Sequence, residues 1–266
     1  MPKFSRQTSL LLLVGIAAGF LSGLFGVGGG ILVVPGLMIF AKLDQRMAHG
    51  TSLAAVLPIS AASLVSYWAH DHVDWSVALF LSLGAIVGAV IGTALLARVS
   101  KRALSLTFAG ILFVAGVRLF FGINGDGRVT ITVVTALALV LIGVFTGALA
   151  GLLGVGGGIV MVPVMAVLFG IPSVVAKGTS LAVIIPTAIM GTSRNRKNSN
   201  VDLPAAAIVG VTGIIFAIAG AWVSARMSET LSNTMFAFLL LGVAVRMIMQ
   251  SRNSGTQPDA ATAITE

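Results

Sequence analysis

The stretch Gly23-Leu-Phe-Gly-Val-Gly-Gly-Gly-Ile-Leu-Val-Val-Pro35 occurs a second time, as Gly151-Leu-Leu-Gly-Val-Gly-Gly-Gly-Ile-Val-Met-Val-Pro163. Ten of the 13 positions are identical, and the offset between the copies is 128 residues. Each copy lies in a long run without Asp, Glu, Lys or Arg, from 9 to 41 and from 129 to 176. Glycine weakens a helix by about 1 kcal/mol relative to alanine. Three consecutive glycines in an apolar run therefore predict a broken membrane helix, whose freed backbone groups line a cavity or pack against protein.

The composition places the chain in a membrane. Of its 266 residues, 57% are hydrophobic and only 9% are charged, and the mean hydropathy is +1.07. A soluble domain carries about 25% charged residues, so we expect a multi-pass membrane protein. The absence of cysteine excludes disulfides and thiolate metal sites. The net charge of +8 lies in short loops, which indicates the positive-inside rule rather than nucleic-acid binding.

The apolar segments repeat as a unit of five. The halves match without a gap from about residue 14 to 120 at the same offset, and Gly50-Thr-Ser-Leu-Ala54 recurs as Gly178-Thr-Ser-Leu-Ala182. We predict a cytoplasmic N-terminus (1–9), a first repeat (10–122), a linker (123–129), a second repeat (130–250) and a polar disordered tail (251–266). The ten segments are 10–25, 28–41, 47–69, 75–97, 103–121, 130–153, 156–169, 175–193, 203–225 and 231–250.

Five segments is an odd number, so the second repeat should be inserted upside down, and the loop charges agree. Residues 70–74 of the first repeat contain no Lys or Arg, whereas the equivalent loop of the second begins with Arg194-Asn-Arg-Lys197. The loop at 98–102 holds three basic residues, whereas its equivalent combines Arg226 with Glu229. The basic loops alternate between the copies as inversion requires.

Two segments, 28–41 and 156–169, are short for a span, since about 20 residues cross a membrane. Each is expected to be a half-helix or a tilted span, kinked or ended at Pro35 or Pro163, and Pro58 and Pro186 are expected to break their helices. The predicted fold is an all-α polytopic transmembrane helix bundle of two inverted-topology repeats, with eight to ten membrane segments and glycine-broken helices.

The glycine motifs are candidates for an anion site, because free N–H groups at a helix start bind anions and glycine lets a ligand approach the backbone. Inverted repeats would bring the two motifs together near the membrane midplane. The alternative is that the glycines only allow close helix packing and that the Ser and Thr hydroxyls bond their own backbone. The candidate site comprises Gly28, Gly29, Gly30, Thr51, Ser52, Gly156, Gly157, Gly158, Thr179 and Ser180.

With these paired motifs, the chain resembles the sulfite exporter TauE/SafE family, also called the toluenesulfonate uptake permease family. The resemblance covers about residues 10–250 and rests on the doubled Gly-Val-Gly-Gly-Gly-Ile and Gly-Thr-Ser-Leu motifs. It implies a plasma-membrane transporter of small sulfur-containing or organic anions, such as sulfite or sulfonates. The resemblance specifies the class better than the substrate, and the direction of transport and the oligomeric state stay open.

Ionisable residues complete the candidate site. His49 and Lys177 occupy the same position of the two repeats, just before Gly-Thr-Ser. Lys177 is a candidate to attract the anion and His49 to carry a coupled proton, while the alternative is that both side chains extend to the membrane surface. Asp74 and Asp202 are interpreted as helix N-caps. No acidic residue lies inside a predicted span, so a coupled proton would travel on His49 or on the substrate.

Other functions are less well supported. The glycine motif lacks the Gly-x-Gly-x-x-Gly order of a dinucleotide site, and no Gly-Lys-Ser/Thr phosphate loop is present. We predict no cofactor, no metal site and no enzymatic activity, because a nucleophile with its base is missing from the spans. The predicted function is a secondary transporter that works by alternating access. The alternatives are an anion channel and a membrane accessory or assembly protein that transports nothing.

Overall fold

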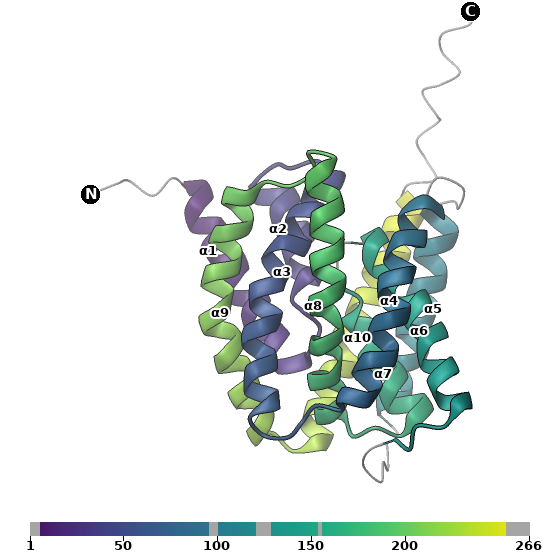
Figure 1. Cartoon of the computed structure of the whole chain (residues 1–266). Helices are drawn as coiled ribbons and strands as arrows, with labels where there is room; N and C mark the ends of the chain where they lie inside the picture. Colours follow the sequence, from purple (N-terminus) through teal and green to yellow (C-terminus); the bar gives the residue numbers. More distant parts are fainter. Residues whose placement is uncertain (1–5, 96–100, 121–128, 154–155, 254–266) are drawn as a thin grey trace, which may run out of the picture.

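The computed structural model describes residues 6–95, 101–120, 129–153 and 156–253. Within these ranges the chain forms helices and no strands, as predicted (Figure 1). The predicted linker (123–129), the tail (251–266), the first five residues and the loop at 98–102 lie largely outside the described residues. The helices are α1 (Arg6–Phe25), α2 (Gly30–Phe40), α3 (Gln45–Trp68), α4 (Trp75–Leu95), α5 (Lys101–Leu119), α6 (Val133–Leu153), α7 (Gly158–Phe169), α8 (Ser173–Lys197), α9 (Leu203–Arg226) and α10 (Glu229–Asn253).

Six of the described helices are long and apolar enough to cross a membrane. The helices that follow the glycine motifs are short: α2 has 11 residues and α7 has 12. At about 1.5 Å per residue such a helix covers little more than half of a hydrocarbon core about 30 Å thick. Both are therefore half-helices that begin inside the protein, in agreement with the glycine-broken helices that the sequence predicts.

The second repeat is inverted. Figure 1 shows the loop between α3 and α4 at one end of the bundle and the equivalent loop between α8 and α9 at the other. The two loops share a backbone conformation, because Asp71 and Ser199, which correspond in the repeats, both have positive φ, at 57° and 55°. The loop after α8 follows Arg194, Arg196 and Lys197, so the positive-inside rule assigns that end to the cytoplasm.

The helices of the two repeats are exchanged. Helix α1 packs along α9, and its equivalent α6 packs along α4. These are glycine contacts: a Cβ added to Gly19 would lie 2.3 Å from the Gly213 carbonyl oxygen, and one added to Gly84 would lie 2.0 Å from that of Val140. One group, defined by these contacts, thus contains α1, α2, α3 and α9. The helices equivalent to them in the other repeat, α6, α7, α8 and α4, form the second group, and α3 packs against α8 between the two.

The prolines do not end the helices, so the expectation that Pro58 and Pro186 break theirs was wrong, and of the kink or end expected at Pro35 and Pro163 the end does not occur. Helices α2 and α7 continue through Pro35 and Pro163, and α3 and α8 continue through Pro58 and Pro186. A proline removes one backbone N–H and leaves the carbonyl four residues earlier without its usual donor. In the described residues, the interruptions within the two glycine-containing segments therefore occur at the glycines and not at the prolines.

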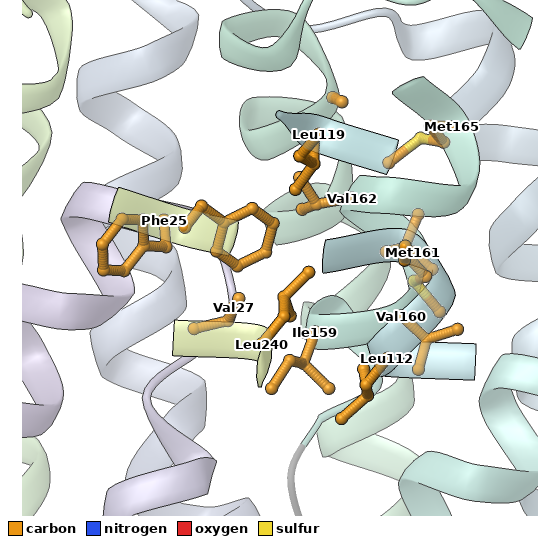
Figure 2. Packing of buried hydrophobic residues seen from close by; sticks show 14 of the residues in the cluster. Phe25, Val27, Leu112, Leu119, Ile159, Val160, Met161, Val162, Met165 and Leu240 are labelled. Carbon is orange, nitrogen blue, oxygen red and sulfur yellow. The ribbon is translucent and has the colours of Figure 1, made fainter. Parts of the chain in front are cut away.

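An apolar cluster fixes α7 in place. Figure 2 shows Phe25 and Val27 beside Ile159 and Leu240, with α7 residues from Val160 to Met165 on the far side of the cluster. The Phe25 ring stacks on Phe236 of α10 at 5.3 Å between centroids. Because Phe25 ends α1 and Ile159 follows the start of α7, this cluster joins the two glycine motifs through their own flanking residues.

Candidate functional site

Both glycine motifs form the same turn. The φ angles are 77° and 72° at Gly28 and Gly29, and 79° and 75° at Gly156 and Gly157. This left-handed conformation is strained for any residue with a side chain, which explains why glycine stands there. Helices α2 and α7 begin immediately afterwards, and neither receives a side-chain cap. Each turn therefore presents the uncapped N-terminus of a half-helix, where backbone N–H groups and the helix dipole favour negative charge.

The two turns converge. A Cβ built on Gly28 would lie 3.1 Å from both Val56 and Ile184, and one built on Gly156 would lie 3.3 Å from Ile184 and 3.6 Å from Val56. Val56 of α3 and Ile184 of α8 are themselves equivalent in the repeats. Gly158 faces the carbonyl oxygen of Gly26, 2.9 Å from its built Cβ. The glycines of the two repeats, far apart in sequence, surround one pair of aliphatic side chains.

Hydroxyl groups lie beside both turns. Ser180 Oγ would be 2.8 Å from a Cβ on Gly158, and Ser60 Oγ 3.2 Å from one on Gly28. Both serines are fully buried, and their hydroxyls have no hydrogen-bond partner in the described part of the chain. Ser52, the counterpart of Ser180, is also buried. The sequence analysis selected Ser52 and Ser180 but missed Ser60. The feature that could have identified Ser60 is its position, eight residues after Ser52 and on the same face of α3.

The threonines of the second motif are engaged elsewhere. Thr179 Oγ1 accepts a hydrogen bond from the Asp74 amide, and Thr51 Oγ1 accepts one from the Asp202 amide, both at 2.9 Å. The glycine before each threonine leaves space for the same loop, because a Cβ on Gly178 would lie 2.0 Å from the His72 carbonyl oxygen. The Gly-Thr pair of each repeat thus holds the loop that precedes a helix of the other.

The aspartates of these loops cap the helices that follow. Asp74 Oδ1 accepts from the Val77 amide and Asp202 Oδ1 accepts from the Ala205 amide, each at 3.0 Å. The N-cap interpretation of both aspartates agrees with this geometry. Together, the Gly-Thr pair and the Val-Asp pair form one structural unit that occurs at each end of the bundle.

Lys177 and His49 differ in their surroundings. Lys177 is 1% exposed, and its ammonium donates to Ser224 Oγ at 3.3 Å and to Ser232 Oγ, with the Phe25 ring centroid 5.7 Å away. Its backbone touches the first glycine turn, since a Cβ on Gly26 would lie 2.6 Å from Lys177 Cα. His49 is only partly buried and lies near the start of α3, which is at the opposite end of the bundle from the start of α8 (Figure 1). Lys177 and His49 therefore occupy equivalent positions in the two repeats but differ in burial.

Tyr67 extends the polar network around Lys177. Its hydroxyl lies 2.8 Å from the Gly23 carbonyl oxygen and 3.0 Å from Ser224 Oγ, and the side chain is 3% exposed. The equivalent residue is Asn195, which donates to Gly191 of its own helix at 2.8 Å. In the described part of the chain, Asn195 makes no contact like that of Tyr67 to Gly23. It lines a small pocket at the basic end of the bundle, together with Gly151, Thr187 and Arg194 among others. Tyr67 and Ser224 were not singled out in the sequence, although Tyr67 is the only tyrosine in the chain.

The groups at the glycine turns are of types that can bind an anion. No group of three or more His, Cys, Asp or Glu side chains that would hold a metal is found in the residues that the structure describes. The polar groups at the glycine turns are hydrogen-bond donors, namely helix N-termini and serine hydroxyls. The buried lysine, Lys177, contacts Gly26 of the first motif through its backbone.

Comparison with known proteins gives a consistent result. The family model described as sulfite exporter TauE/SafE matches residues 10–175 and again residues 139–265. The chain is 27% identical to the probable membrane transporter protein YunE of Bacillus subtilis over 251 residues, which cover 85% of this chain and 89% of that protein. It is 30% identical to the probable membrane transporter protein MJ0441 of Methanocaldococcus jannaschii over 194 residues, 71% of this chain and 72% of the relative.

Proposed function

The chain belongs to the sulfite exporter TauE/SafE family of multi-pass membrane transporters, and we propose that it is a secondary transporter that moves a small sulfur-containing or organic anion by alternating access. The observation that carries the proposal is the convergence of two uncapped half-helix N-termini, one from each inverted repeat, on the buried hydroxyls of Ser60 and Ser180.

These donors match the chemistry of a sulfonate or sulfite group. Such a group has three oxygen acceptors arranged around sulfur, and it accepts hydrogen bonds from several directions at once. Backbone N–H groups at the starts of α2 and α7 approach from two sides, and the two serine hydroxyls supply further donors. The partial positive charge of each helix start complements the anion.

The way this centre is filled supports the proposal of alternating access. Val56 and Ile184 lie against the glycines, so a substrate reaches the turns only when α3 and α8 shift relative to one another. At one end Tyr67 ties α3 to α1 and α9, whereas at the cytoplasmic end the equivalent position leaves a pocket. We therefore assign the moving bodies to the two exchanged helix groups rather than to the two sequence repeats.

The replacement Ser180→Ala tests the substrate site, with Ser60→Ala as a second variant. Removing a buried hydroxyl that lacks a partner costs no hydrogen bond, so the protein should be as stable as before or slightly more stable. If the hydroxyl donates to the anion, the KM for uptake into proteoliposomes should rise about tenfold, in line with about 1.5 kcal/mol for a hydrogen bond to a charged group. The measurement is uptake of labelled sulfite, and separately of a small labelled sulfonate.

Ser173→Ala is the matched control, because Ser173 is also buried without a side-chain partner in the described structure but lies two turns away, at the start of α8. An unchanged KM in both Ser180→Ala and Ser60→Ala would contradict the assigned site. Wild-type flux that proceeds without any counterflow exchange would identify a channel. Absence of flux for every anion offered would remove the transport proposal for this substrate class.

A further inference from the structure

Lys177 stands apart from the other basic residues of the described chain. It is the one Lys or Arg there that is fully buried, in the first half of α8, and its backbone touches the first glycine turn at Gly26. Its nitrogen has two hydroxyl partners, Ser224 of α9 and Ser232 of α10. An ionisable group inside a span is costly unless it is paired, and such groups often serve ion or proton movement.

The hydrogen bonds around Lys177 form a directed chain. The Tyr67 hydroxyl lies within bonding distance of both the Gly23 carbonyl and Ser224 Oγ, but it has only one proton. A carbonyl can only accept, so Tyr67 donates to Gly23 and the Ser224 hydroxyl is left to donate to Tyr67. Lys177 donates in turn to Ser224. The ammonium is thereby connected through two hydroxyls to the last turn of α1, where the helix dipole is negative.

The charged and titratable groups that face Lys177 are few. Helix α3 contributes Tyr67, and α10 contributes Glu229, whose charge acts on Lys177 but whose carboxylate is exposed and accepts from the Ser173 amide at 3.3 Å. Helices α1 and α9 present Phe25 and Ser224 to the ammonium, while Arg226 of α9 is exposed and stacks on Trp222. No carboxylate forms an ion pair with Lys177 in the described residues.

We propose that Lys177 is the residue that couples anion transport to proton transport, an inference that rests on the proposed transport function and deepens it. The neutral amine takes up one proton, and the ammonium so formed binds one anion, giving a pair without net charge. Movement of the helix groups exposes the pair to the opposite side, where the anion and the proton both leave and the neutral amine returns. The Ser232 hydroxyl suits both forms of the lysine, because a hydroxyl accepts from the ammonium and donates to the amine.

This assignment differs from the expectation for His49, which is partly exposed and lies away from the buried network. A buried ammonium without a carboxylate is stabilised by an anion and destabilised when the anion leaves. Binding of the anion and of the proton are therefore linked through one nitrogen atom, and each increases the affinity for the other.

The test uses the full-length protein in proteoliposomes that contain a pH-sensitive dye, with a labelled small sulfonate as the probe. A sulfonate stays singly negative across the working pH range, so any proton that moves with it is carried by the protein. Two rates are measured: exchange of the sulfonate without a pH gradient, and net uptake driven by an acidic outside. The variant Lys177→Arg keeps a positive charge but cannot release its proton. The matched control is Lys197→Arg, at the exposed end of the same helix.

We expect Lys177→Arg to exchange sulfonate with a raised KM, because the guanidinium replaces the ammonium that binds the anion. The variant should also lose the acceleration by the pH gradient and lose the dye signal, while Lys197→Arg behaves as wild type. Gradient-driven uptake with an unchanged dye signal in Lys177→Arg would overturn the proposal while leaving the transport function standing. Wild-type protein that exchanges no anion would instead defeat the transport function and the coupling with it.

A second variant decides the matter if Lys177→Arg is not inserted into the membrane. Ser224→Ala removes one acceptor from the ammonium but leaves the lysine in place. Sulfonate uptake by Ser224→Ala should therefore reach half of its maximum at a lower pH than in wild type. Because a purely structural serine would change the amount of active protein and not its pH profile, an unchanged profile would count against Lys177 as the proton carrier.

Discussion

At the scale of single residues, the second duplicated motif separates into parts with different tasks. Its glycine admits a loop carbonyl and its threonine accepts a backbone hydrogen bond, and in the second copy its serine, Ser180, lies beside Gly158 of the glycine turn. The sequence selected both hydroxyls of each motif as equal candidates for the substrate. It did not distinguish them, because the partner of each threonine is a loop of the opposite repeat, more than 100 residues away along the chain.

Thr179→Val tests this division. Valine keeps the shape but leaves the buried Asp74 amide without its acceptor, which costs about 1–3 kcal/mol of folding stability. We expect a lower unfolding temperature in detergent, with the KM of the remaining transport unchanged. Thr187→Val is the control, since the Thr187 hydroxyl only bonds Val183 of its own helix. A raised KM at normal stability would instead place the Thr179 hydroxyl on the substrate.

At the scale of elements, the loops between α3 and α4 and between α8 and α9 share one conformation but differ in chemistry. His72 of the first loop corresponds to Asn200 of the second, and the carbonyl oxygens of both lie against a glycine, Gly178 and Gly50. Burial, and then the neighbouring charge of His70, lower the pKa of His72, while Asp71 partly opposes this. The loop at the extracellular end therefore responds to pH, whereas Asn200 of the cytoplasmic loop does not titrate.

The sign of this response is specific. With a lowered pKa in the folded state, His72 binds fewer protons when folded than when unfolded, so acidification below about pH 6.5 favours unfolding. We expect the unfolding temperature to fall as the pH decreases from about 7 to about 5, and His72→Asn, which copies the other loop, to reduce that fall. Unfolding temperatures measured at both pH values check this. An identical fall in the variant would show that other groups cause it.

At the scale of the whole molecule, the sequence predicted the duplication, the inversion and the ten helices, because hydropathy and loop charge report directly on spans and sides. It did not predict the exchange of α4 and α9 between the repeats. An apolar membrane helix is hydrophobic all round, so its pattern does not say which neighbour it packs against. The prediction that Pro58 and Pro186 break their helices was wrong for a related reason, because packing with neighbouring helices overrides a local helix-breaking signal.

The interface between α3 and α8 should carry the transport motion. The chain lacks cysteine, so a pair can be introduced without interference: Leu53→Cys with Gly191→Cys, where a Cβ on Gly191 would lie 2.7 Å from Leu53 Cδ1. Oxidation should tie the two helix groups together at the cytoplasmic end and abolish uptake, and reduction should restore it.

The control pair is Val14→Cys with Gly36→Cys, within one group, where a Cβ on Gly36 would lie 3.3 Å from Val14 Cβ. Its oxidation should leave uptake intact. Full activity of the oxidised Leu53–Gly191 pair would show that α3 and α8 do not move apart at this end.

The exchange of helices also governs how the protein is made. Helix α1 leaves the ribosome well before α9, the helix that covers it, because α2 to α8 lie between them in the chain. Until residues 203–226 are synthesised, the glycine-lined face of α1 lacks the helix that covers it. The packing of the first repeat is therefore incomplete during this time. A product that stops after the first repeat therefore presents this uncovered face to the proteases that remove incomplete membrane proteins. By the same geometry, a half-length ancestor would have buried this face only as a dimer. Its two copies would be inserted in opposite directions, and each would pack its fourth helix against the first helix of the other.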